Sequence, residues 1–289
     1  MNMLAMIRLL RPEQWYKNLT VFLAIIFSGE AFLPGAAEKS LTSFAIVSLL
    51  SGVNYALNDV FDAEKDALHP EKKRRPLASG EIRKHHAVLF AIGVLVAALA
   101  ASFSLNLFFA AAASSFFLFG LLYTTTLKHI YIVDVIAIGI NFSLRAALGV
   151  LAIGAMMSPW LFLCTFLIAL LLALGKRKSE AAFLGSEAAK HRKVLSSYAQ
   201  SATDPIIVVT LSSLIISYSI YSILVRHTSS MILTIPIAMF LAFKYSSFVF
   251  SNNSIARSPE TVFADRSMLA GMTLWLAIIL YSLYLPQIF

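Results

Sequence analysis

Long apolar runs alternate with short polar segments along the whole chain. Most of these runs approach the roughly 20 residues that a helix needs to cross a bilayer, and they are longer than the ~10 residues of a barrel strand. Because the backbone inside a bilayer must satisfy its own hydrogen bonds, we predict that the runs are helices. Nine such helices are expected, at about 19–35, 41–57, 87–104, 107–123, 131–155, 159–174, 204–225, 231–249 and 268–286.

Composition agrees with an integral membrane protein. Of the 289 residues, 59% are hydrophobic and 13% are charged, whereas an average soluble domain has about 25% charged residues. The single cysteine, Cys164, lies inside an apolar run, which excludes a disulfide or a cysteine-based metal site. The expected fold class is all-α integral membrane, with nine transmembrane helices in a single domain, 1–289.

Positive charge is distributed unevenly between the two ends of the predicted helices. With the N-terminus in the cytoplasm, twenty of the 23 Lys and Arg residues fall on the cytoplasmic side, and only Lys39 and Arg226 fall outside. Such an excess is typical of cytoplasmic loops. We therefore expect a multi-pass cell membrane protein with a cytoplasmic N-terminus and its C-terminus on the opposite side. The expected partner of this chain, whose net charge is +8, is the bilayer and not nucleic acid.

Two polar segments of the chain, 58–86 and 175–203, are much longer than the other connections and lie on the cytoplasmic side. Connections longer than about 12–15 residues in a compact protein are usually functional or disordered. The turns at 104–106 and near 157–159 are minimal by comparison. The working site is therefore predicted at the cytoplasmic face, where these two functional loops lie.

The segment 58–76, NDVFDAEKDALHPEKKRRP, has the clearest candidate chemistry. Asp59, Asp62 and Asp66 recur at i, i+3 and i+7, so one helical face presents all three carboxylates. Oxygen ligands of this kind suit hard divalent cations such as Mg²⁺. Most charge runs are solvated loops, but the apolar segments on both sides place these charges at a membrane boundary. We predict that the three aspartates are the metal-binding and catalytic residues.

Cations follow these carboxylates closely along the chain. Arg74 and Arg75 are predicted to bind phosphate oxygens, because a guanidinium group can bind phosphate through two parallel hydrogen bonds. Participation of Lys72 and Lys73 is left open. Asn58 precedes Asp59 and is expected to line the same substrate site, since polar residues at the end of an apolar helix are costly unless they face an interior cavity.

The N-terminal segment, 1–18, is predicted to lie at the membrane interface. Its polar residues Arg11, Gln14, Lys17 and Asn18 either anchor the segment at the headgroup level or contact the substrate. Lys17 and Asn18 are the substrate-binding candidates among them.

Another polar cluster surrounds the start of the fifth predicted helix. An ionisable residue inside a membrane helix is a functional candidate by default, which applies to Asp134 and Arg145. Eleven residues separate the two, about 16 Å along a helix, so a direct ion pair is not expected. Tyr123, Lys128 and Asp134 are predicted to line the substrate cavity.

The segment 175–203 contains six cations and only two acids, Glu180 and Glu187. This composition is either ordinary cytoplasmic positive charge or a surface that binds a phosphate group. The substrate-binding candidates here are Lys176, Arg177, Glu180 and Arg192.

Together these segments resemble a known family. An NDxxDxxxD motif after the second of nine predicted helices is similar to the UbiA superfamily of intramembrane prenyltransferases. The resemblance is closer to its decaprenyl-phosphate (polyprenyl-phosphate) phosphoribosyltransferase branch, through RPEQWYKN at 11–18, the whole of 58–76, YTTTLKHIYIVD at 123–134, and GKRKSE with HRKVLSSY within 175–203. It covers essentially the whole chain. It implies a UbiA-like bundle with a central cavity that opens to the cytoplasmic side.

The resemblance also implies a reaction. This branch transfers 5-phosphoribosyl from phosphoribosyl pyrophosphate (PRPP) to a polyprenyl phosphate, with Mg²⁺ as the implied cofactor. Typical members of the wider superfamily have a second aspartate-rich motif where this chain reads GKRKSEAAFLG, with Glu180 as the only carboxylate. The loss of acids and gain of bases favours a second phosphate-bearing substrate over a second metal site. Lys176, Arg177 and Arg192 are then the candidates for the lipid phosphate.

Two other functions are alternatives. A conventional UbiA prenyltransferase would join a prenyl diphosphate to an aromatic or other small acceptor, but it needs the second acidic motif. A transporter or lipid-binding protein would show internal repeats or paired broken helices, and the sequence shows neither. The isoprenoid length is not determined. Small residues such as Gly149 and Gly154 can pack helices within one chain or between chains, so a homo-oligomer is left open.

Overall fold

The computed structural model describes residues 3–67, 72–185, 188, 193–199, 202–224 and 229–284. Every regular element within these ranges is a helix. Eight of the described helices are long and apolar enough to cross a membrane, and they coincide with eight of the nine predicted ones. The predicted all-α membrane fold class is confirmed, and the chain is a multi-pass membrane protein.

The remaining predicted helix, 19–35, has a different form in the structure. Pro12–Phe22 form the 3₁₀ helix η1, and Leu23–Ser28 form the short helix α2, which ends at Gly29 with a φ of 78°. Neither element has the length of a membrane-crossing helix. Runs of 3₁₀ helix longer than three or four residues are uncommon because their hydrogen-bond geometry is poor. Tertiary contacts must therefore hold η1.

The chain forms two compact units. The first comprises Met1–Thr126 and Leu144–Met157, and the second comprises Leu127–Ser143 and Ser158–Phe289. Helix α6 (Val133–Ile153) contributes its N-terminal half to the second unit and its C-terminal half to the first.

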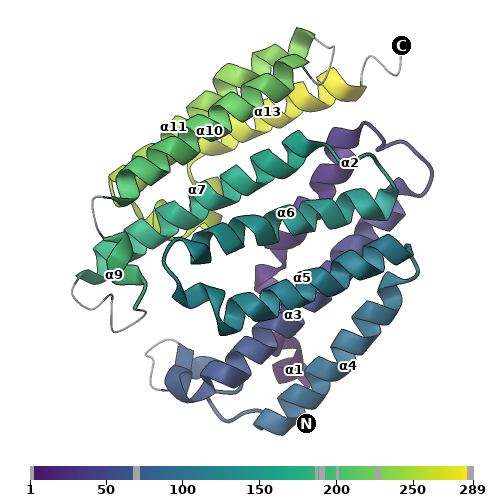
Figure 1. The fold of residues 1–289 in the computed structure, drawn as a ribbon, viewed down its shortest axis with the longest axis vertical. Helices are drawn as coiled ribbons and strands as arrows, with labels where there is room; N and C mark the ends of the chain where they lie inside the picture. Colours follow the sequence, from purple (N-terminus) through teal and green to yellow (C-terminus); the bar gives the residue numbers. More distant parts are fainter. Residues whose placement is uncertain are drawn as a thin grey trace. The chain divides into compact units, whose positions relative to one another are not determined.

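In the first unit, the long helices α3, α4 and α5 pack against one another (Figure 1). Helix α3 has 32 residues, so it is about 48 Å long, whereas the hydrocarbon core of a bilayer is about 30 Å thick. Its last turns therefore extend beyond the apolar run. Helix α3 thus continues past residue 57, where the predicted helix ended, and Asp59, Asp62 and Asp66 all lie on it. The bounds are α1 (Met3–Leu9), α3 (Ala36–Ala67), η2 (Lys72–Arg74), α4 (Lys84–Ser102) and α5 (Leu107–Thr125).

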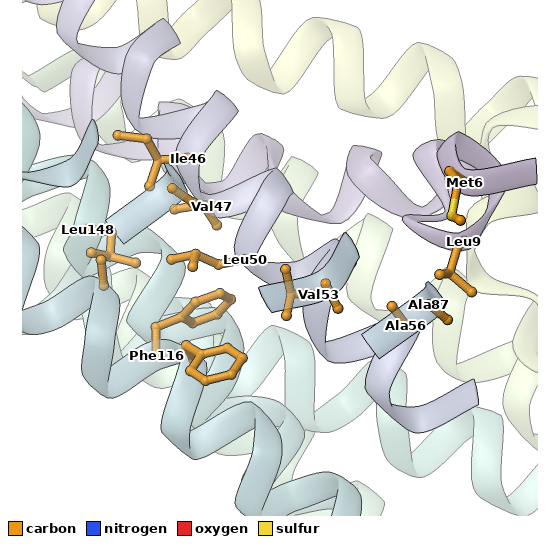
Figure 2. Close-up of a cluster of buried hydrophobic side chains, with 14 of the residues drawn as sticks. Met6, Leu9, Ile46, Val47, Leu50, Val53, Ala56, Ala87, Phe116 and Leu148 are labelled. Atoms are coloured by element: carbon orange, nitrogen blue, oxygen red, sulfur yellow. The ribbon is translucent and has the colours of Figure 1, made fainter. Parts of the chain in front are cut away.

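Buried apolar side chains fix the short helix α1 to this unit. Figure 2 shows Met6 and Leu9 of α1 beside Ala56 of α3 and Ala87 of α4, and all four side chains are fully buried. The same cluster continues to α5 and α6 at its other end (Figure 2). The position of Arg11, two residues after α1, is therefore set by a protein core.

In the second unit, α7 packs against α10, and α11 packs against α13 (Figure 1). Helix α7 continues past residue 174, where the predicted helix ended, through Lys176, Arg177 and Glu180. The elements are η3 (Leu127–His129), α7 (Pro159–Leu184), α9 (Leu195–Tyr198), α10 (Thr203–Leu224), η5 (Ser229–Leu233), α11 (Thr234–Phe250), α12 (Ser254–Arg257), η6 (Pro259–Ala264) and α13 (Arg266–Tyr284).

Candidate active site

Helix α3 presents two buried carboxylates near its C-terminal end. Asp59 is 2% exposed and Asp66 is 4% exposed, and their i, i+7 spacing puts them on one face. Arg75 Nη1 donates to both of them, over 3.1 Å to Asp59 Oδ1 and over 2.5 Å to Asp66 Oδ2. The two carboxylates therefore converge on a single position, which a positively charged nitrogen occupies.

A second guanidinium group, from the residue just before η1, approaches Asp59. Arg11 donates from Nη2 to Asp59 Oδ1, and its guanidinium carbon lies 5.4 Å from the centre of the Tyr55 ring. Arg11 itself has a left-handed backbone, with φ of 49°, which is uncommon for a residue other than glycine. Its contact with Asp59 spans 48 positions, so no local sequence pattern indicates it. The sequence allows Arg11 either to anchor the N-terminal segment or to contact the substrate. In the structure, Arg11 is an ion-pair partner of Asp59.

The chemistry of these carboxylates fits a divalent metal ion. They are hard oxygen ligands, and Arg75 Nη1 stands where a shared cation would be held. Asp62 lies between them on α3 and is half-buried. Among the residues that the structure describes, no group of three or more His, Cys, Asp or Glu side chains is already arranged to hold a metal. Metal binding by Asp59, Asp62 and Asp66 therefore stays a prediction, and it requires Arg75 to move.

The other predicted residues of the first unit differ in their surroundings. Arg74 is exposed, whereas Asn58 and Tyr123 are half-buried. Lys17 donates from Nζ to Gln14 Oε1 over 2.6 Å. Substrate contact by these four residues stays a prediction.

Asn18 is at the centre of a buried hydrogen-bond network and is 1% exposed. Its Oδ1 accepts from Arg145 Nε over 2.7 Å and from Ser51 Oγ over 3.2 Å, and its Nδ2 donates to Ser48 Oγ over 3.0 Å. The Arg145 guanidinium also lies 5.1 Å from the centre of the Phe116 ring. These bonds fix η1 to α3 and to α6. The amide that sequence analysis assigned to the substrate binds the protein itself in this structure.

In the second unit, Asp134 is fully buried and binds two donors. It accepts from the Tyr198 hydroxyl and, over 3.0 Å, from Arg177 Nε. Arg177 Nη1 also donates to Glu180 Oε2 over 3.2 Å. Burial, and then the hydrogen bond to Asp134, raises the pKa of Tyr198, so the hydroxyl stays protonated near neutral pH. Both predicted carboxylates of this unit are thus bound to one arginine.

Three other residues of the second unit were predicted to bind or line the substrate site. Lys176 and Lys128 are half-buried. Arg192 lies outside the residues that the structure describes. Sequence reasoning missed the role of Tyr198, whose bond to Asp134 spans 64 positions, and the ion pair of Lys178 with Asp204 at 2.5 Å.

We expect Tyr198→Phe to lower the free energy of unfolding by about 1–3 kcal/mol, the typical cost of an unsatisfied buried acceptor. Without the hydroxyl, the buried Asp134 carboxylate loses one of its donors. Thermal unfolding of the purified protein in detergent measures the change.

The matched control is Tyr131→Phe. The Tyr131 ring packs on that of Tyr198, with centroids 4.8 Å apart, but its buried hydroxyl has no hydrogen-bond partner among the residues that the structure describes. Removing that hydroxyl should leave stability unchanged or slightly higher. Equal losses in the two variants would show that the bond to Asp134 contributes nothing specific to stability.

Most of the chain is similar to known proteins. A model described as the UbiA prenyltransferase family matches residues 18–259. A decaprenyl-phosphate phosphoribosyltransferase of Mycolicibacterium smegmatis is 31% identical over 221 residues, which are 75% of this chain and 70% of that protein. One from Corynebacterium glutamicum is 27% identical over 298 residues, covering 98% of this chain and 88% of that protein.

Solved structures share the fold. A UbiA homologue from Archaeoglobus fulgidus bound to GPP and Mg²⁺ has a TM-score of 0.72 and 20% identity, and the match covers 96% of this chain and 99% of that one. A digeranylgeranylglyceryl phosphate synthase also has a TM-score of 0.72, at 18% identity, covering 96% and 97%. Likeness at such low identity establishes the fold and leaves the reaction to be argued from residues.

Proposed function

Because the chain belongs to the UbiA prenyltransferase family, we propose that it is a membrane-embedded transferase of a particular kind. It moves 5-phosphoribosyl from PRPP to a polyprenyl phosphate and releases pyrophosphate. Relatives that are 27% and 31% identical over most of the chain are described as decaprenyl-phosphate phosphoribosyltransferases, which supports this choice.

The observation that carries the choice of substrates is the position of Arg177. A prenyl diphosphate held by a second metal ion would need several carboxylates on α7, whereas Glu180 is the only one on that helix. Here Asp134 and Glu180 both bind Arg177, and Lys176 and Lys178 lie beside it in the sequence. This part of α7 is suited to a phosphate group, which a polyprenyl phosphate carries and an aromatic acceptor lacks.

The donor would be bound by the first unit. Asp59, Asp62 and Asp66 would hold Mg²⁺, which would neutralise charge on the leaving diphosphate. Arg75, Arg74 and Lys17 would bind phosphate oxygens, and Asn58 and Tyr123 would line the donor site. Positioning and charge neutralisation then supply most of the catalysis.

In the transfer itself, the bond between ribose carbon 1 and the diphosphate oxygen breaks, and pyrophosphate leaves with the electron pair. Carbon 1 becomes oxocarbenium-like, as in other glycosyl transfers. A phosphate oxygen of the lipid then forms the new bond to carbon 1. That phosphate is already ionised near pH 7, so no general base is required. Lys176, Arg177 and Arg192 are the candidates for binding it, and Lys128 and Asp134 would line the site.

The proposed reaction also has a defined place in the membrane. The isoprenoid tail would stay among the apolar helices, and the reaction would take place at the cytoplasmic face of the cell membrane. The distribution of Lys and Arg supports this orientation.

The test is transfer of label from PRPP labelled in the ribose, by membranes containing the protein, to polyprenyl phosphates of several lengths. We expect label to enter the organic phase only when polyprenyl phosphate and a divalent metal are both present, and chelation with EDTA should abolish it. The lipid that gives the highest rate would identify the isoprenoid length.

The same membranes should be offered geranyl diphosphate with small aromatic acceptors. Prenyl transfer without any phosphoribosyl transfer would overturn the proposal in favour of a conventional prenyltransferase. Membranes carrying Asp59→Asn serve as the blank for both reactions.

A further inference from the structure

The arrangement of charge around Asp59 and Asp66 implies more than a binding site. We propose that Arg11 and Arg75 are exchangeable counter-ions. They neutralise the two carboxylates in the empty site and transfer to the diphosphate when a divalent metal takes their place. Metal and diphosphate would then bind cooperatively, each weakly alone. The inference rests on the proposed function only in that this site takes a metal together with a diphosphate.

Burial requires a counter-ion in the empty site. The Asp59 and Asp66 side chains are 3% and 6% exposed, and two nearby carboxylates in such surroundings repel each other and are poorly solvated. Arg75 contacts both carboxylates, and Arg11 contacts Asp59. The exposed Lys72 also lies 3.9 Å from Asp66. Positive side chains thus neutralise both carboxylates before any ligand arrives.

The positions of the Arg11 and Arg75 side chains allow them to move. The Arg11 and Arg75 side chains are 19% and 26% exposed, so they lie on the solvent side of the carboxylates. The carboxylates are fixed on one helix, whereas the arginines come from separate segments, one before η1 and one after η2. Either guanidinium can therefore turn toward a ligand entering from solution while α3 stays in place.

Each ligand alone meets an unfavourable charge. A divalent metal that binds both carboxylates must displace Arg75 Nη1, because that atom contacts both of them. The metal would then lie beside two guanidinium groups that have lost their carboxylate partners, and these positive charges would repel it. A diphosphate that drew the arginines away without a metal would leave two buried carboxylates without their counter-ions. Bound together, the metal takes the carboxylates and the freed arginines bind phosphate oxygens, for which their planar donors are well suited.

Cooperativity of this kind is reciprocal and can be measured. The first experiment follows thermal unfolding of the purified wild-type protein with Mg²⁺ alone, with inorganic pyrophosphate alone and with both. We expect the combination to raise the melting temperature by clearly more than the sum of the separate shifts. A shift with Mg²⁺ alone as large as that of the combination would overturn the proposal.

The second experiment uses Arg75→Gln and Arg11→Gln. Without pyrophosphate, each variant should bind Mn²⁺, counted by loss of its free paramagnetic resonance signal, about 10-fold more tightly than wild type. At saturating Mg²⁺, each should bind pyrophosphate about 10-fold more weakly. A merely structural role would lower both affinities or change neither, and either result would overturn the exchange.

Arg83→Gln is the matched control, since it removes one positive charge from an exposed residue of the same unit. Both of its affinities should equal those of the wild type.

Pyrophosphate is common to PRPP and prenyl diphosphates, so the outcome does not depend on which donor is used. Cooperativity without phosphoribosyl transfer would refute only the proposed function, and transfer without cooperativity would refute only the exchange. If a variant fails to fold, the wild-type experiment decides.

Discussion

Asp59→Asn should reduce phosphoribosyl transfer by at least about 100-fold, the scale seen when one preorganised electrostatic contact to a transition state is lost. Asp59 is the carboxylate on which Arg11 and Arg75 meet. A neutral amide is a weaker ligand for a hard divalent cation, and it leaves both guanidinium groups without their shared charge partner. The initial rate with labelled PRPP, divided by the amount of folded protein in the membrane, measures the effect.

The same outcome is expected for Asp62→Asn, which tests whether the half-buried middle carboxylate belongs to the metal site. Glu64→Gln is the matched control, because its side chain lies on the same helix, is 89% exposed and pairs with Lys84 at the surface. Surface ion pairs contribute little, so this variant should keep wild-type activity. Near wild-type transfer by Asp59→Asn would refute the metal assignment.

Asn18→Leu is expected to lower the free energy of unfolding by about 3 kcal/mol. Hydrogen bonds to charged groups contribute about 1.5–3 kcal/mol, and a buried donor left unsatisfied costs more. The substitution removes the acceptor that Arg145 Nε reaches at 2.7 Å, together with bonds to Ser48 and Ser51. Because these bonds fix η1, the variant should also loosen the segment that carries Arg11. Thermal unfolding in detergent measures the first effect, and protease cleavage within 12–22 measures the second.

Ser48→Ala is the control for the loss of one neutral bond from the same network. It should lower the free energy of unfolding by only about 1 kcal/mol. If Asn18→Leu were no worse than Ser48→Ala, the Arg145 bond would contribute nothing to stability. Wild-type resistance to cleavage would show that η1 is held by other contacts.

The membrane helices were predictable because each depends mainly on its own residues. A run such as 107–123 has no alternative to a helix in a bilayer, since its backbone groups find no other partners there, and α5 occupies Leu107–Thr125. Helix ends were less predictable. Helix α3 continues to Ala67 and α7 to Leu184, because a helix goes on past the apolar run wherever no strong breaker follows and charged residues can reach water.

The segment 19–35 is an exception to the rule that an apolar run of membrane length forms one helix. Its composition suits a membrane helix, yet the chain forms η1 and α2 there. The contacts that hold η1 come from Ser48, Ser51 and Arg145. The last of these is 127 positions away, so no window of sequence contains the reason.

By itself, the sequence determined that this protein crosses the membrane several times and that Asp59 and Asp66 share one helical face. Both properties follow from hydrogen bonding and side-chain spacing within a single helix. Only the tertiary structure decided which cations neutralise those carboxylates, why Asn18 is buried, and that Tyr198 and Arg177 share Asp134. Charged and polar side chains find their partners wherever folding brings them together, and burial makes those pairings obligatory.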